Sequence, residues 1–180
     1  MPRTEDRMLH FGINNCRDLY DKLVFERDRL RDTHYKNKYD VFNFIITAHH
    51  LHDDWLNKDG ITRPKLACKK RDRAPIEMKQ IVQAFKDLAN GNKHMLLNDR
   101  GLAQKVVDSV HQPEIRDWFS YCYGPHIGIP IGNYYYSCPI LVDLIMSYFQ
   151  WIFDDSIPVN EFPLEIKEQF EKAIRPVNVR

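Results

Sequence analysis

The chain has 180 residues, the length of one domain that can bury a hydrophobic core without a disulfide or a metal ion. Its 26 basic and 25 acidic residues leave a net charge of +1, so overall charge gives no argument for a nucleic-acid or membrane partner. The chain contains only seven glycines, about half the usual share, which favours helices.

No apolar run approaches the ~18 residues that cross a membrane, and the first residues lack the apolar segment of a secretory signal. The four cysteines form no CxxC pair, which is typical of reduced thiols in a cytoplasm. No Gly-rich phosphate loop or HExxH motif occurs, so no cofactor is expected. We therefore expect a single cytoplasmic helical domain over residues 1–180, with residues 1–14 and 175–180 at its periphery and no membrane partner.

Apolar residues recur at helical spacing in four long segments of the sequence. Asn14 or Asn15 can cap the first of them. Pro75 in the first turn and Gly91 after the last turn delimit the third, which has the clearest pattern. The helices are expected over residues 15–31, 39–56, 75–91 and from about 139 onward, followed by a short amphipathic piece at 164–174.

Residues 120–137 have a different sequence pattern from the helical segments. Isoleucines alternate with other residues from Ile127 to Ile131, and Gly132-Asn133 is a turn signal between aromatic flanks. This pattern predicts a small β-hairpin. The expected fold is mainly α, a four- to five-helix bundle with a small β-hairpin inserted before the last long helix.

Charge is unevenly distributed along the chain. Residues 57–75 hold seven basic and two acidic side chains, a local net charge of +5, and are expected to form a basic loop. Residues 139–174 hold seven acidic and two basic side chains, a local net charge of −5. The basic loop is either a solvated linker or a surface that contacts phosphates. Its candidate nucleic-acid ligands are Lys69, Lys70, Arg71 and Arg73.

The second predicted helix carries a cluster of histidines and aspartates. In a helix, His49 and Asp53 lie one turn apart on the same face, as do His50 and Asp54. Such pairs can share a proton, and imidazole and carboxylate are also common metal ligands. Three interpretations stay open: acid–base catalysis without a metal, a metal site that uses His49, His52 and Asp53, or a purely structural role.

The end of the third predicted helix offers a second candidate site. Lys93 can hold a phosphate as a point charge, and His94 can move a proton near neutral pH. Asn90 lies one turn before them. The alternative is a helix C-cap in which Lys93 and His94 complement the negative end of the helix dipole.

Two segments carry a resemblance to a known family: FNFIITAHHLHDDW over residues 42–55 and DLANGNKH over residues 87–94. Together they resemble a family of bacterial and phage proteins with an FNF…TAxHLxxDW helix, a DLANxxKH helix end, a β-hairpin and a closing helix. That family implies no activity. The layout distantly resembles the HEPN superfamily, helical bundles that are common in toxin–antitoxin and phage-defence systems. The HEPN resemblance implies a homodimer and RNA or a protein as partner.

Many HEPN proteins are metal-independent ribonucleases with an Arg-x4–6-His motif near a helix end. The arginine binds the scissile phosphate, and the histidine handles protons. Before His94 the corresponding positions are Asp87, Leu88 and Ala89, so Lys93 stands in for the arginine as a point charge.

The leading hypothesis is an HEPN-like ribonuclease or RNA-associated effector of a bacterial or phage conflict system. His50 or His94 takes the 2′-hydroxyl proton, the other protonates the leaving oxygen, and Lys93 holds the phosphate. Asp53 or Asp54 orients an imidazole. Antiparallel packing is expected to bring His94 within hydrogen-bonding range of His50 or Asp54. The alternatives are a non-catalytic regulatory or adaptor module and a metal-binding helical bundle.

Overall fold

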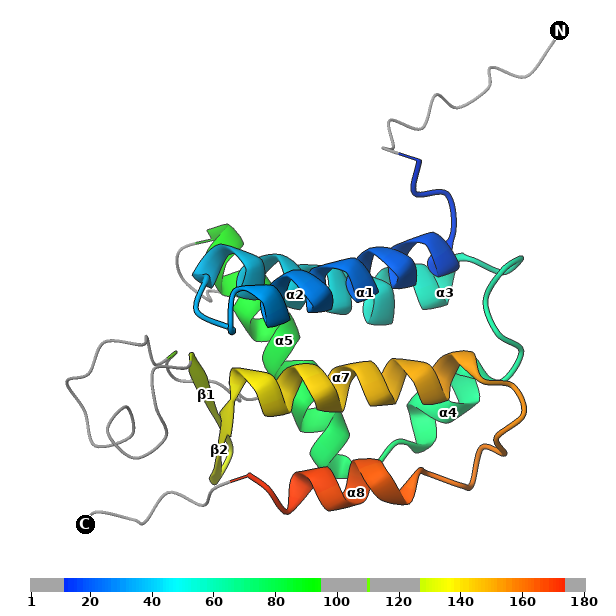
Figure 1. Cartoon of the computed structure of the whole chain (residues 1–180). Helices are drawn as coiled ribbons and strands as arrows, with labels where there is room; N and C mark the ends of the chain where they lie inside the picture. The colour runs from blue at the N-terminus through cyan, green and yellow to red at the C-terminus, as the bar shows by residue number, and fades with distance from the viewer. Residues whose placement is uncertain (1–11, 95–109, 111–126, 174–180) are drawn as a thin grey trace, which may run out of the picture.

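The computed structural model describes residues 12–94, 110 and 127–173, with the backbone alone for residues 92–94. This part of the chain is mainly helical and has a two-stranded antiparallel hairpin before the last long helix, which confirms the predicted fold class (Figure 1). The long helices are α1 (Cys16–Asp32), α2 (Lys38–His50), α5 (Ile76–His94) and α7 (Cys138–Phe153). The shorter elements are the π-helical turn η1 (Leu51–Trp55), α3 (Leu56–Lys58), α4 (Ala67–Arg73), β1 (Gly128–Ile131), β2 (Tyr134–Ser137) and α8 (Leu164–Phe170).

The predicted helices form within a few residues of their expected limits. Asn15 caps α1, because its side-chain oxygen accepts the backbone N–H groups of Arg17 and Asp18. α5 continues through Gly91 to His94, so the predicted stop at this glycine is wrong. The predicted short piece at 164–174 ends as a helix at Phe170.

Two features differ from the sequence analysis. The second helix is a continuous rod of α2, η1 and α3, and the sequence pattern did not predict its π turn. Residues 57–75 are only partly a loop, because Ala67–Arg73 folds as α4. In the described residues, Cys16, Cys68 and Cys138 are free thiols, and Cys122 lies outside them.

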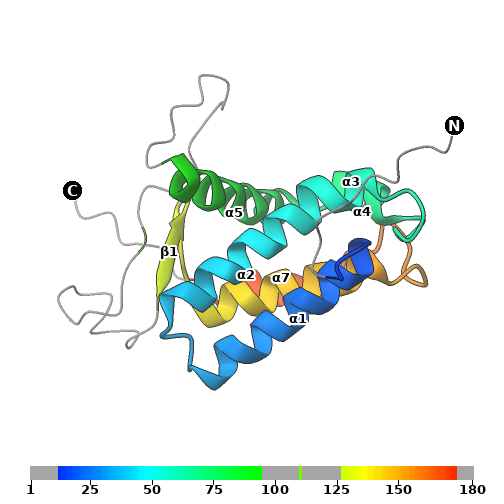
Figure 2. The same cartoon turned by 90° about the horizontal axis from the view of Figure 1, so that it is seen from above.

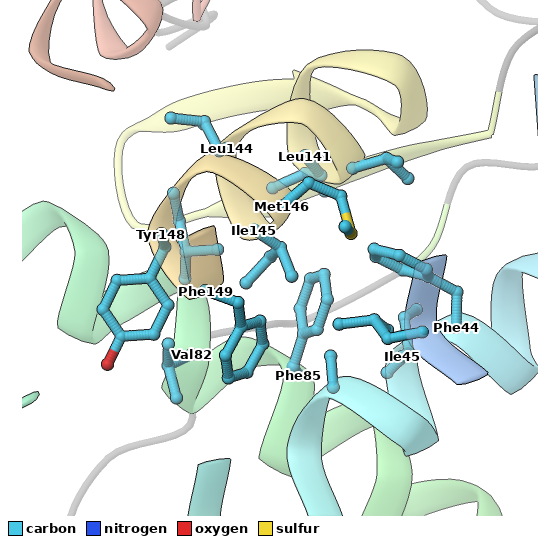
Figure 3. Close-up of a cluster of buried hydrophobic side chains, with 14 of the residues drawn as sticks. Phe44, Ile45, Val82, Phe85, Leu141, Leu144, Ile145, Met146, Tyr148 and Phe149 are labelled. Carbon is cyan, nitrogen blue, oxygen red and sulfur yellow. The ribbon is translucent and has the colours of Figure 1, made fainter. Parts of the chain in front are cut away.

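The core lies where α2, α5 and α7 meet. Figures 1 and 2 show α1 beside α2, with α7 below them and α5 crossing the bundle. Phe44 and Phe85 meet edge to face with ring centroids 6.3 Å apart, and both pack against α7 near Ile145 and Phe149 (Figure 3). Although α7 is almost entirely apolar, no helix of the described residues is long and apolar enough to cross a membrane.

The hairpin closes the end of the bundle just before α7. Gly132 has a φ of 59°, and it begins the two-residue turn with Asn133 that the sequence predicted. The strands pair antiparallel, with Gly128 opposite Ser137, and the Cys138 N–H donates to the Ile127 carbonyl at 2.7 Å. The chain therefore passes from β2 directly into the first turn of α7.

Helix α4 is attached to the end of α7 just before its first turn and at its middle residue. The Asp155 carboxylate, just after α7, accepts the backbone N–H groups of Lys65 and Leu66, each at 3.2 Å. These donors precede the first turn of α4, where backbone N–H groups lack intrahelical partners.

The side chain of Lys70, in the middle of α4, makes the second attachment. It is 0 % exposed, and its ammonium donates to the carbonyls of Trp151, at 2.7 Å, and Asp154. Both carbonyls belong to the C-terminal end of α7, where a cation complements the helix dipole. Burial lowers the pKa of Lys70, although the charges of Asp154 and Asp155 oppose the shift.

We expect Lys70→Met to lower the free energy of unfolding by about 1–3 kcal/mol, because it leaves two carbonyls without their donor. Lys69→Met is the matched control, since Lys69 is the exposed neighbour on the same helix and should change stability by less than about 0.5 kcal/mol. Urea denaturation of both variants measures the difference. Equal unfolding midpoints for the two variants would contradict this account of α4.

Candidate functional site

The π turn η1 lies in the middle of the histidine- and aspartate-rich segment. The Leu56 N–H reaches the carbonyl of Leu51, five residues back, instead of the carbonyl four residues back. Single π turns inside α-helices are frequent at functional sites, because the extra residue reorients the side chains on either side. Here the turn contains His52, Asp53 and Asp54.

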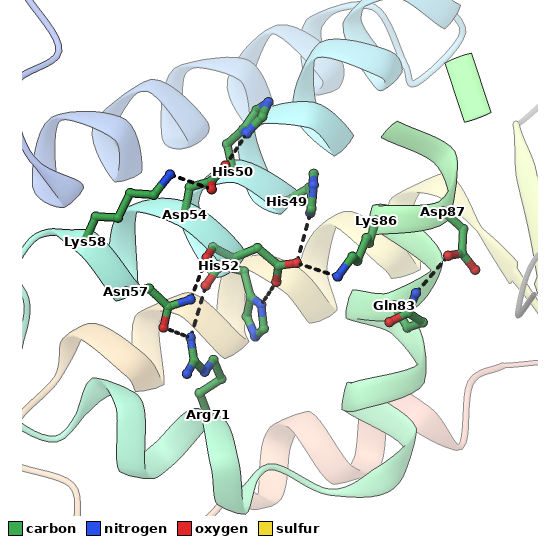
Figure 4. A network of polar contacts seen from close by, with 11 residues as sticks. His49, His50, His52, Asp54, Asn57, Lys58, Arg71, Gln83, Lys86 and Asp87 are labelled. Carbon is green, nitrogen blue, oxygen red and sulfur yellow. Dashed lines mark hydrogen bonds and ion pairs between the residues drawn. The ribbon is translucent and has the colours of Figure 1, made fainter. Parts of the chain in front are cut away.

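His52 and Asp53 form a close pair in this turn. The Nδ1 of His52 lies 2.7 Å from Oδ1 of Asp53. The other carboxylate oxygen of Asp53 lies 3.3 Å from Nζ of Lys86 on α5 and 3.7 Å from Nδ1 of His49. Two histidines and a lysine from two helices therefore converge on the Asp53 carboxylate. Figure 4 shows His49, His52 and Lys86 directed toward this common point.

The pair lines a cavity of about 360 Å³ between η1, α4 and α5. Its wall on α5 includes Lys79, Gln83 and Lys86, which follow one another at intervals of four and three residues on one helix face. The Tyr148 ring of α7 lies behind His52, with the two ring centroids 5.9 Å apart. The cavity thus combines a titratable pair with lysines on its opposite wall.

The electrostatics of the cavity keep Asp53 ionised. Burial raises the pKa of Asp53, but the hydrogen bond from His52 and the charges of His52, His49 and Lys86 outweigh it and lower the pKa to about 2. An ionised carboxylate only accepts hydrogen bonds, so the proton between the pair resides on Nδ1 of His52. When the ring is in its neutral form, this arrangement places its lone pair on Nε2.

His49 makes weaker contacts with Asp53 than His52 does. Burial lowers the pKa of His49, and this effect outweighs the opposing charge of Asp53. Among the described residues, its buried Nδ1 makes no hydrogen bond. His49 is therefore neutral near pH 7 and is held against Asp53 without a close contact.

The predicted His50–Asp54 pair forms, but it lies outside this cavity. The Nδ1 of His50 is 2.8 Å from Oδ2 of Asp54, and Lys58 binds the other oxygen of the same carboxylate at 3.0 Å. The His50 side chain is 50 % exposed and does not line the cavity. The hydrogen bond to His50, together with that to Lys58, lowers the pKa of Asp54.

The second predicted set lies at the far end of α5. Lys86 contacts the end of the α2–η1 rod, whereas Leu88 shares a second cavity with Val41 and Ile45 earlier in α2. α5 therefore runs toward the start of α2, and residue 94 is about 12 Å beyond residue 86 along the axis. Asn90 is half-buried on this last part of α5. The side chains of Lys93 and His94 lie outside the described residues, so their contact with His50 or Asp54 stays a prediction.

The structure separates the four basic residues proposed as nucleic-acid ligands. Lys69 and Arg73 are exposed on α4. Lys70 is buried against the end of α7, and its ammonium is occupied by carbonyls, so it cannot reach a phosphate in this conformation. Arg71 turns inward to the π turn and lines the cavity.

The suggested metal ligands His49, His52 and Asp53 do lie near one another. Across the described parts of the chain, however, no group of three or more His, Cys, Asp or Glu side chains is arranged to hold a metal ion. Asp53 instead has a lysine and two imidazoles around its carboxylate.

Sequence reasoning missed the α5 and α4 sides of the cavity. The spacing of Lys79, Gln83 and Lys86 is a usable signal, since it forms a polar stripe beside the apolar face of α5. Nothing in the local sequence distinguishes Arg71 from the other basic residues of α4, because its role depends on contacts with residues 52–57.

No protein-family model, curated protein sequence or solved structure matches this chain.

The low pKa of Asp53 predicts that the free energy of unfolding decreases as the pH falls through the acid range. The pKa falls from 3.8 to about 2 on folding, so the ionised carboxylate stabilises the fold above pH 3.8, and this contribution is lost as the pH falls toward 2. We expect the stability advantage of the wild type over Asp53→Asn to shrink by about 1–2 kcal/mol between pH 5 and pH 2.

Urea denaturation at a series of pH values measures this term. Asp72→Asn is the control, because this carboxylate lines the same cavity but its side chain is 72 % exposed. A stability difference for Asp53→Asn that stays constant with pH would show that Asp53 is not held by the histidines and the lysine.

Proposed function

We propose that this chain is an HEPN-like ribonuclease that cleaves RNA without a metal ion, with His52 as the proton acceptor. The observation that carries the proposal is the hydrogen bond between His52 and the ionised Asp53 in the wall of a cavity that also holds lysines. A histidine oriented by a carboxylate is a recurrent general base. The cavity is large enough for a phosphate and its adjoining sugar.

His52 takes the proton of the RNA 2′-hydroxyl on Nε2, since its Nδ1–H is committed to Asp53. The 2′-oxygen forms a bond to phosphorus, and the bond from phosphorus to the 5′-oxygen breaks. The leaving 5′-oxygen takes a proton from water, and the hydroxide left behind takes the proton from His52. The products are a 2′,3′-cyclic phosphate and a 5′-hydroxyl, and His52 returns to its starting state.

Lys86 and Lys79 supply positive charge for the phosphate. Lys86 uses one side of its ammonium for Asp53, at 3.3 Å, and an ammonium has three donors. Lys79 donates to the Asp72 carbonyl at 2.6 Å, which holds its side chain along the cavity. Fixed cations stabilise the charge that develops on the phosphate in the transition state.

The chain offers a matched pair of histidines for the test. His52 and His50 lie on the same rod, and each has an aspartate at hydrogen-bond distance, but only His52 lines the cavity. We expect His52→Gln to lower kcat on an RNA oligonucleotide by about 10²–10⁴-fold, and His50→Gln to leave it unchanged. The assay uses purified full-length protein with and without EDTA, and product ends are identified as cyclic phosphate or not.

Each other outcome points to a different interpretation. Loss of activity in His50→Gln or His94→Gln, with His52→Gln active, would move the centre to the residues that the sequence suggested. Cleavage that stops in EDTA would indicate a metal-dependent enzyme. Absence of cleavage by the wild type would leave a non-catalytic binding module as the better description.

A further inference from the structure

The π turn creates a backbone carbonyl that needs a new partner. In an α-helix the N–H of residue 56 would bond to the carbonyl of residue 52, but here the Leu56 N–H reaches Leu51. The Nη1 of Arg71 lies 3.5 Å from the His52 carbonyl that this shift releases. Carbonyls inside a protein are nearly always paired, and α4 places a guanidinium beside the carbonyl that has lost its α-helical partner.

Arg71 is also linked to the carbonyl of Asp53 through the side chain of Asn57. Its Nη1 donates to Oδ1 of Asn57 at 2.6 Å, and Nδ2 of Asn57 donates to the Asp53 carbonyl at 2.5 Å. Because the Asn57 oxygen accepts from Arg71, its nitrogen is turned toward Asp53. One guanidinium thus holds the backbone of both residues of the proton-accepting pair (Figure 4).

The guanidinium of Arg71 makes these contacts from a partly buried position. The Arg71 side chain is 22 % exposed, and its Nε lies 3.7 Å from the Asp72 carboxylate. Lys70, the preceding residue, fixes the same helix to the end of α7. Adjacent residues of a helix point about 100° apart, so α4 can be anchored through Lys70 while it presents Arg71 to the π turn.

We infer that Arg71 is a positioning residue that holds the π turn, and with it His52, against Asp53. This inference rests on the proposed function. A turn that reverted to α-helical geometry would rotate the side chains after it by about 100° relative to those before it. His52 and Asp53 both lie within this turn, so the reversion would move the pair relative to Lys86 on α5, and the contact of His52 Nδ1 with the Asp53 carboxylate would no longer be held in place.

The test follows the Nδ1–H proton of His52 by NMR in full-length protein labelled with ¹⁵N-histidine, assigned by its loss in His52→Gln. We expect Arg71→Ala to remove this slowly exchanging resonance and to lower kcat on RNA by about 100-fold with KM little changed. Asn57→Ala should also weaken the resonance, since it breaks the Asp53 carbonyl contact. Lys65→Ala, which removes an exposed basic side chain just before the same helix, should change neither quantity.

A folded Arg71→Ala protein that keeps the resonance would overturn the inference. So would a raised KM with unchanged kcat, which would identify Arg71 as a phosphate ligand. If circular dichroism shows that Arg71→Ala does not fold, Asn57→Ala decides by the same resonance. The resonance can be observed without RNA cleavage. If the wild type shows the resonance but no nuclease activity, and Arg71→Ala loses the resonance, the positioning role stands while the proposed function fails.

Discussion

The buried ammonium of Lys70 is the contact on which the arrangement around the cavity depends. It joins α4 to the last carbonyls of α7, which among the described helices contributes the most residues to the core. Asp155 completes the attachment by accepting the N–H groups before α4. Without these contacts α4 would be a seven-residue helix with little apolar surface, and such short helices are not stable alone.

The fixed position of α4 explains how a distorted helix can persist between α2 and α3. A π turn leaves backbone groups without their usual partners, and its geometry is maintained only where the surroundings compensate. Arg71 and Asn57 supply that compensation at the carbonyls of His52 and Asp53. The π turn in return brings a carboxylate against two imidazoles, and Lys86 neutralises part of its charge from α5. The low pKa of Asp53 is the electrostatic result of this convergence.

The α2–η1–α3 rod carries two histidine–aspartate pairs with similar contacts, but the pairs have different surroundings. His50 and Asp54 satisfy the i, i+4 spacing and form their contact, but they face outward beside Lys58. His52 and Asp53 are neighbours in sequence, an arrangement that the i, i+4 rule does not single out, and they line a cavity with cations across from them. Proximity to a cavity and to opposing charge, rather than spacing, distinguishes the pair that we assign to catalysis.

The sequence by itself determined the helical class, the positions of the long helices and the hairpin turn at Gly132-Asn133, because these depend on local periodicity, caps and turn residues. It also identified residues 49–54 as a titratable cluster. Only the tertiary structure decided which histidine faces the cavity, since the π turn changes the helical phase and no local pattern encodes it. The roles of Lys70, Arg71 and Lys86 were likewise decided by packing. Their contacts are with residues 14–84 positions away in the chain, and these contacts are set by how α4, α5 and α7 meet the rest of the fold.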